Sequence, residues 1–162
     1  MVMSKRTIKR RRRENKTDYK LRLNLLKSGE KRIVIRTTNK YFIASAVESR
    51  EAQDFVLKSV TSKDLIKNSW DAKSGGSLKS IPAGYLTGRL LAKELGKGKY
   101  IIDLGMARTS KGCRVFSAVK GLIDGGLEIN AKDSVFPSED RLAGEHLKPE
   151  LKQMIAGVLA KL

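Results

Sequence analysis

The residues best suited to chemistry in this chain are four consecutive arginines, Arg10 to Arg13. A guanidinium group binds phosphate through paired N–H donors and also stacks on exposed bases. The first forty residues hold fifteen Lys and Arg against three acids, so this segment carries +12 of the chain's net charge of +17. Because unpaired cations are costly to bury, the segment needs an external polyanion, and its arginine content favours nucleic acid.

Two other interpretations of such a basic run stay open beside this one. A cluster of this size also serves as a nuclear address or as a tether to an anionic membrane surface. Between Lys5 and Lys16 the only large apolar residue is Ile8, so the segment lacks the apolar face with which an amphipathic helix enters a membrane. Nucleic acid is therefore the favoured partner, and no membrane partner is expected.

The composition limits the class of protein. The chain has 162 residues, of which 40% are hydrophobic and 31% charged, as expected for one domain of moderate size with a basic tail. Met1-Val2-Met3 leads directly into charged residues instead of the apolar core of a signal peptide, which predicts a cytosolic protein. One Cys and one His cannot form an internal disulfide or a usual structural zinc site.

No group of residues predicts catalysis. The loops around Lys79 and Lys111 lack the Gly-Lys-Ser/Thr order of a phosphate-binding loop. Asp103 has no nearby acids in the sequence with which to hold a catalytic metal, so we interpret it as a loop-capping residue. His146 lacks a partner nucleophile and is interpreted as structural. We expect no enzyme, cofactor, metal or small-molecule substrate, with a nuclease using Asp103 and a DNA-packaging protein as the rival hypotheses.

The pattern of apolar residues predicts an α/β fold with a mixed sheet. The expected elements are a helix from Thr17 or Asp18 to Gly29, strands at 32–38, 41–47 and 55–61, a loop at 68–80, helices at 82–96 and about 114–124, a strand at 100–104, and two helices after residue 138. The first two strands form a hairpin around Asn39-Lys40. Gly84 and Gly88 predict that a neighbouring element packs closely against their helix.

Four segments in order along the chain resemble a known family. They are Arg10–Tyr19, Val34–Lys40, Ala83–Ala92, and Lys120–Leu127 together with Phe136–His146. These segments are similar to large-subunit ribosomal protein eighteen in its archaeal and eukaryotic form. The chain stops soon after its last expected helix, without the long basic extension of the eukaryotic form, which favours the archaeal form.

The resemblance implies a structural constituent of the cytoplasmic large ribosomal subunit that binds 5S ribosomal RNA. Such a protein helps to attach 5S RNA to the large-subunit RNA in the central protuberance, beside neighbouring ribosomal proteins that include the other 5S-binding protein. The implied fold is a three-layer α/β/α domain of ribonuclease-H-like topology without nuclease activity. We expect a basic RNA-binding arm at 1–16, the α/β domain that binds 5S RNA at 17–135, and a C-terminal helical segment packed on it at 136–162.

The resemblance also assigns RNA contacts by position. It places them at Arg10, Arg11, Arg12, Arg13, Lys16, Tyr19, Arg22, Arg36, Thr37, Thr38, Asn39 and Lys40. Residues beside these, together with two basic loops, complete the expected interface with Lys5, Arg6, Lys9, Thr17, Tyr41, Lys73 and Lys111. For Tyr19 and Tyr41, stacking on bases and burial in the core remain equal alternatives, whereas Phe42 is expected in the core.

Overall fold

The chain folds into alternating helices and strands that follow the order expected from its sequence. The computed structural model describes residues 7–51, 53–71 and 77–162. Within these ranges the elements are α1 (Arg10–Arg13), α2 (Tyr19–Lys27), β1 (Arg32–Thr37), β2 (Phe42–Arg50), β3 (Gln53–Thr61), the 3-10 helix η1 (Ser62–Asn68), α3 (Ile81–Leu95), β4 (Gly98–Lys99), β5 (Ile101–Asp103), α4 (Arg114–Asp124), β6 (Leu127–Glu128), the 3-10 helix η2 (Asp133–Val135), α5 (Glu139–Ala143) and α6 (Pro149–Lys161).

A four-stranded mixed sheet of order β3-β2-β1-β5 forms the centre of the molecule. β1 pairs antiparallel with β2, β2 pairs antiparallel with β3, and β5 runs parallel to β1. The pairing of Thr37 with Phe42 places Asn39 and Lys40 at the turn between β1 and β2. This arrangement confirms the predicted hairpin and mixed sheet, and its strand order agrees with the expected ribonuclease-H-like topology.

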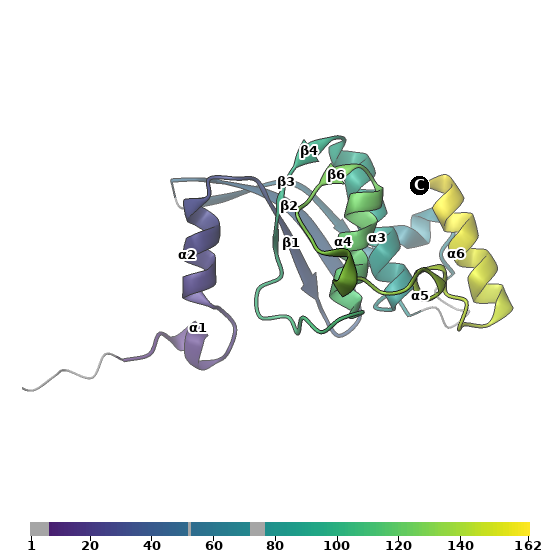
Figure 1. Ribbon diagram of the computed structural model, residues 1–162, viewed down its shortest axis with the longest axis horizontal. Coiled ribbons are helices and arrows are strands. Elements are labelled where there is room, and N and C mark those ends of the chain that lie inside the picture. The colour runs from purple at the N-terminus through teal and green to yellow at the C-terminus, as the bar shows by residue number, and fades with distance from the viewer. Residues whose placement is uncertain (1–6, 52, 72–76) are drawn as a thin grey trace, which may run out of the picture.

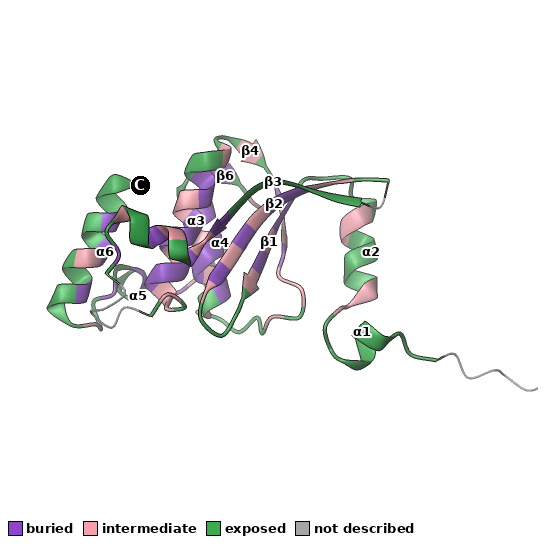
Figure 2. Cartoon of the chain, turned by 180° about the vertical axis from the view of Figure 1, so that it is seen from behind, coloured by how far each residue is buried: buried purple, intermediate pink, exposed green. Residues whose placement is uncertain are grey.

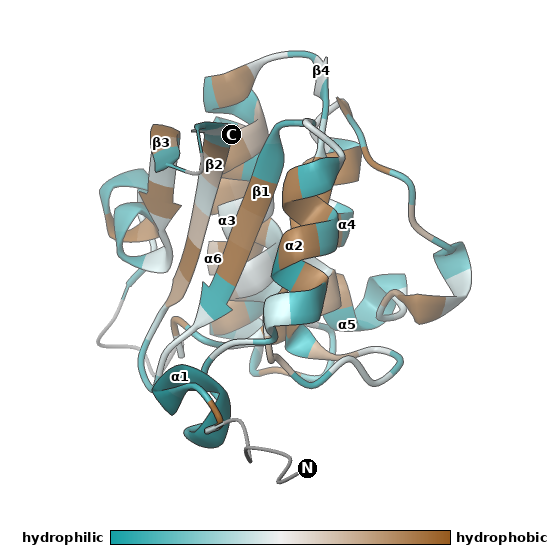
Figure 3. Cartoon of the chain, turned by 90° about the vertical axis from the view of Figure 1, so that its left-hand side faces the viewer, coloured by the Kyte–Doolittle hydropathy of each residue, from teal (hydrophilic) through white to brown (hydrophobic). Residues whose placement is uncertain are grey.

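Helices lie on both faces of this sheet and make three layers. α3 and α4 cover one face, and α2 stands on the opposite side of the strands, with α5 and α6 beyond α3 (Figure 1). Viewed from the side of α2, that helix stands beside β1 and in front of α4 (Figure 3). The expected three-layer α/β/α architecture is thus confirmed. In the part of the chain that the structure describes, no helix combines the length and apolarity needed to cross a membrane.

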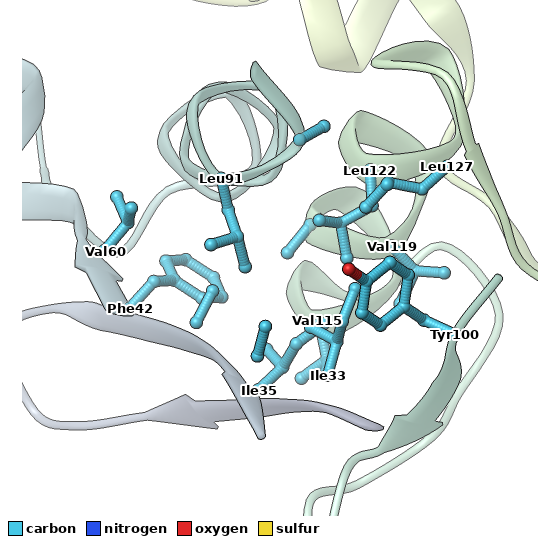
Figure 4. Packing of buried hydrophobic residues seen from close by; sticks show 14 residues of the cluster. Ile33, Ile35, Phe42, Val60, Leu91, Tyr100, Val115, Val119, Leu122 and Leu127 are labelled. Atoms are coloured by element: carbon cyan, nitrogen blue, oxygen red, sulfur yellow. The ribbon is translucent and has the colours of Figure 1, made fainter. Parts of the chain in front are cut away.

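The main core lies between the sheet and the helix pair α3 and α4. Alternate residues of β1, Ile33 and Ile35, point into it beside Phe42, and α3 and α4 contribute residues that include Leu91 and Leu122 (Figure 4). The expected burial of Phe42 is confirmed. The same division is visible over the whole chain, because burial is concentrated between sheet and helices while α1 and α2 stay exposed or half-buried (Figure 2).

A second, smaller core attaches the C-terminal helix. Ile155 and Val158 of α6 pack with Leu86 of α3, Leu65 of η1 and Trp70. The described part of the 68–80 loop is irregular as predicted, yet its tryptophan is only 2% exposed. A buried aromatic residue of this size anchors the start of the loop firmly to the helical side of the domain.

The contact between α3 and α4 depends on glycine. A Cβ atom on Gly88 would overlap the carbonyl oxygen of Ala118, and a Cβ on Gly121 would overlap the carbonyl oxygen of Tyr85. A Cβ on Gly84 would lie 2.6 Å from Ser117 Oγ. The two helices therefore touch backbone to backbone, which confirms the close packing predicted at Gly84 and Gly88.

Replacing Gly88 by Ala should lower the free energy of unfolding by about 2 kcal/mol or more, because a backbone oxygen cannot move aside for the added methyl group. Gly157→Ala in α6 is the matched control, since nothing lies within 4 Å of its added Cβ. That control should stabilise the protein by up to about 1 kcal/mol through helix propensity. Chemical denaturation measures both values, and equal effects of the two substitutions would contradict the close helix contact.

Candidate nucleic-acid interface

The arginine run forms a short, exposed helix at the end of the molecule. α1 consists of Arg10 to Arg13 alone, and none of its residues is buried. Two nearby acids hold its shape: Glu14 lies 3.9 Å from Arg10 and 2.8 Å from Lys16. Arg12 lies 3.8 Å from Asp18. The bases outnumber these acids, so the arm keeps a net positive charge toward solvent.

The arm leads into α2, whose start is fixed by one aspartate. Asp18 caps the helix by accepting hydrogen bonds from the backbone N–H groups of Lys20 at 3.0 Å and Leu21 at 3.2 Å. This settles the choice between Thr17 and Asp18 in favour of Asp18. Thr17 instead accepts a hydrogen bond of 2.9 Å from Arg11 Nε. The helix has no fully buried residue, and only Leu25 and Leu26 of its predicted apolar face are half-buried.

Charged side chains hold α2 against the sheet. Asp54 of β3 lies 3.1 Å from Arg22 of α2 and 2.6 Å from Arg32 of β1. Asp103 of β5 lies 3.7 Å from Arg32 and 2.9 Å from Arg36. These five residues alternate in sign across the sheet, and we refer to them as the charge chain. Arg32 at its centre is only 1% exposed.

The environment of Asp54 favours its ionised form. Partial burial raises the pKa of this carboxyl, but a hydrogen bond from Ser49 Oγ and the charges of Arg32 and Arg22 together outweigh burial. The pKa of Asp54 is therefore below its usual value of 3.8. The carboxylate therefore stays charged at neutral pH, where it pairs with the buried guanidinium of Arg32.

Asp103 acts as a loop cap, as the sequence suggested. Its Oδ1 accepts hydrogen bonds of 2.9 Å from the backbone N–H of Gly105 and 2.9 Å from Arg36 Nη2. Among the described residues no group of three or more His, Cys, Asp or Glu is placed to hold a metal ion. His146, the other candidate for catalysis, is exposed between α5 and α6.

The turn between β1 and β2 presents polar groups to solvent. Thr37, Thr38, Asn39 and Lys40 are all exposed. Thr38 shapes the turn: its backbone N–H donates to the Tyr41 carbonyl oxygen at 2.8 Å, and its Oγ1 accepts from the Tyr41 N–H at 2.9 Å. The bonds of Thr38 fix the shape of the turn. The exposed side chains of Asn39 and Lys40 project from it and can contact a ligand.

The two tyrosines of the expected interface are half-buried, outside the core. Lys9 Nζ lies 4.6 Å from the ring centroid of Tyr19, and Lys63 Nζ lies 4.4 Å from that of Tyr41. Core burial, one of the two alternatives, is thereby excluded for both. Each ring has an ammonium group over one face, so any stacked base would use the other face.

The loop at 104–113 lies next to the arm. Met106 of this loop lines a hollow with Ile8, Arg12 and Arg13. A second, polar hollow lies between the arm, α2 and the sheet, and its walls include Arg11, Lys16, Arg22 and Arg36. The structure therefore brings the arm, α2 and the end of β1 to one side of the molecule.

Not every expected site residue meets solvent in the same way. Arg22 and Arg36 belong to the charge chain, although their side chains remain 45% and 43% exposed. Lys9, the four arginines, Lys16 and Lys111 are exposed. Lys5, Arg6 and Lys73 lie outside the described residues. Burial of Arg32 could not be expected from the sequence, because an arginine at the start of a strand usually faces solvent.

An α/β domain with an exposed arm of net positive charge defines a basic protein whose surface is suited to a polyanion. Comparison with known families makes this class specific. The chain belongs to the family described as ribosomal large subunit proteins 60S L5 and 50S L18, whose model matches residues 4–100 and 96–132. It is therefore a structural protein of the large ribosomal subunit, a component of cytoplasmic ribosomes, and not an enzyme.

Curated relatives agree, and they are archaeal. The large ribosomal subunit protein uL18 of Methanoregula boonei is 43% identical over 141 residues, covering 85% of this chain and 79% of the relative. The uL18 protein of Picrophilus torridus is 46% identical over 145 residues, covering 88% and 89%. That of Korarchaeum cryptofilum is 43% identical over 141 residues, covering 85% and 70%. The expected archaeal-type family is confirmed.

Asp54→Asn should lower the free energy of unfolding at neutral pH by about 2 kcal/mol or more, because it leaves the buried Arg32 without its nearest countercharge. The stability that the Asp54 carboxylate adds is fully present above pH 3.8, which is the pKa of this group in the unfolded chain. It is lost as the pH falls through the lower pKa of Asp54 in the folded protein. Thermal unfolding from pH 7 to pH 2 measures this difference.

Glu48→Gln is the control for this experiment. Glu48 pairs at 3.1 Å with Arg50, whose side chain is well exposed, and exposed pairs contribute little to stability. This control should leave the melting temperature at pH 7 almost unchanged. A melting temperature of Asp54→Asn equal to that of Glu48→Gln would show that the charge chain does not stabilise the fold.

Proposed function

We propose that this protein binds 5S ribosomal RNA through its arm and its first hairpin and helps to attach it to the large-subunit RNA in the central protuberance. The observation that carries the proposal is the exposed arginine helix α1, held next to the sheet by α2 and the charge chain. Its partners would be 5S RNA, large-subunit RNA and neighbouring proteins of the protuberance, including the other 5S-binding protein.

The arrangement suits a folded RNA better than an extended polyanion. The arm and the hairpin turn are separate projections, and the turn offers hydroxyl and amide groups beside Lys40. Phosphates are matched by the arginines, whereas the side chains of Thr37 and Asn39 have donors and acceptors for 2′-hydroxyls and base edges, and Thr38 shapes the turn that presents them. Contacts of both kinds are needed to distinguish one RNA from another.

We propose a separate role for each of three segments of the chain. The arm at 1–16 binds RNA phosphates, the α/β domain at 17–135 carries the hairpin contacts, and the C-terminal helical segment at 136–162 packs on the domain. The role of α6 is supported by Ile155 and Val158, which share the second core with α3. The expected contacts at Lys5, Arg6 and Lys73 form part of this proposal by their charge and position in the sequence.

A binding titration separates recognition of 5S RNA from general attraction to phosphate. We expect the protein to bind 5S RNA more tightly than an unrelated RNA duplex of equal length at physiological salt, because only the folded RNA satisfies both the arm and the hairpin. Filter binding of both RNAs to the same preparation gives the ratio of affinities. Equal affinities would contradict specific recognition while leaving the polyanion surface intact.

We expect the replacement of Arg10 to Arg13 by Ala to change the slope of log RNA affinity against log salt concentration. The slope should become shallower by about 3, if each arginine contacts one phosphate. Replacing the same four residues by Lys keeps the charge and should preserve most of this slope, while the loss of bidentate contacts lowers affinity. An unchanged slope in the alanine variant would remove the arm from the interface.

A further inference from the structure

Three arginines from different elements surround one hollow in the fold. Arg108 comes from the loop at 104–113, Arg114 from the start of α4, and Arg141 from α5. The hollow has a volume of about 350 Å³, and Thr37 at the end of β1 forms another part of its wall. No acidic residue lines it. The hollow is thus a concave surface of one charge sign, built from four separate parts of the chain.

The positive charges at this hollow are not neutralised by the protein. Within the described ranges, none of the three arginines forms an ion pair, whereas Arg10, Arg12, Arg22, Arg32 and Arg36 all do. Arg114 makes one hydrogen bond, of 3.4 Å, from Nη1 to the Lys79 carbonyl oxygen. Exposed arginines around one concavity attract an anion from outside, because an opposite charge relieves their mutual repulsion.

The hollow continues the basic surface of the arm. Met106 lines the hollow that Arg12 and Arg13 share, and the next residue, Ala107, lines the hollow of the three arginines. Thr37 connects it on another side with the hairpin turn. The loop at 104–113 therefore runs between two basic concavities, and a backbone that leaves the arm can pass over it to α5.

We infer that the hollow of Arg108, Arg114 and Arg141 is a second RNA-binding site, which holds phosphates of the RNA backbone. The inference rests on the proposed function for the identity of the RNA, but not for the chemistry of the site. Nucleic acid is favoured over an acidic protein because all three bases are arginines, whose fork of N–H donors matches the several acceptor oxygens of a phosphate. Continuity with the arm gives one extended track for a polyphosphate chain.

The double substitution Arg108→Ala and Arg141→Ala tests this site in the full-length protein. Both side chains belong to exposed residues, so folding is not at risk. We expect the salt slope of RNA binding to become shallower by about 1.5, which corresponds to two lost phosphate contacts. The matched control is Lys58→Ala with Lys97→Ala, which removes the same charge from exposed residues of β3 and the segment after α3 and should leave the slope unchanged.

Alkylation of Cys113 tests directly whether RNA binds in this hollow. Cys113 is the only cysteine of the chain and is half-buried in the wall of the hollow. Bound RNA should slow its alkylation by a small thiol reagent, and the double arginine variant should lose most of this protection. Protection by polyglutamate equal to that by RNA at the same charge concentration would overturn the assignment to RNA in favour of an acidic protein.

The results separate this inference from the proposed function. If the arm variant loses its salt slope while the double arginine variant matches the lysine control, the hollow is not an RNA site and the proposed function stands. If 5S RNA binds no better than an unrelated duplex, the proposed function fails, yet a shallower slope in the double variant would still support phosphate binding in the hollow.

Discussion

Burial of one guanidinium group governs how the basic surface is arranged. Arg32 lies at the start of the central strand β1 and has almost no contact with water. A charge in that position is tolerated only with countercharges, and they come from Asp54 on β3, which lies beyond β2, and from Asp103 on the neighbouring β5. Each aspartate then holds a second arginine, so the requirements of one buried residue position α2 on one side and the end of β1 on the other.

The layered fold was predictable because its signals are local. Alternation at Ile33 and Ile35, the cap at Asp18 and the close glycines of α3 each depend on residues within a few positions. The charge chain was not predictable, because it depends on which strands become neighbours. Asp103 carries no mark in the sequence that ties it to Arg32 and Arg36, 71 and 67 positions away.

The candidate interface also has one part that could be predicted from the sequence and one part that could not. The exposed arm could be found from charge alone, since four adjacent arginines have no means of burial. The grouping of Arg108, Arg114 and Arg141 could not, because nothing in the sequence places Arg141 beside the segment that holds Arg108 and Arg114. A local excess of charge is visible along the chain, whereas a local absence of acids in space appears only after folding.

The attachment of α2 differs in kind from that of the other long helices. α3, α4 and α6 bury apolar side chains, but α2 buries none completely and is held by polar bonds. Ion pairs of this sort weaken with salt, and segments with few buried contacts open at much lower free energy than the core. We therefore expect α2 and the arm to separate from the sheet at a lower free energy than the one that unfolds the apolar core.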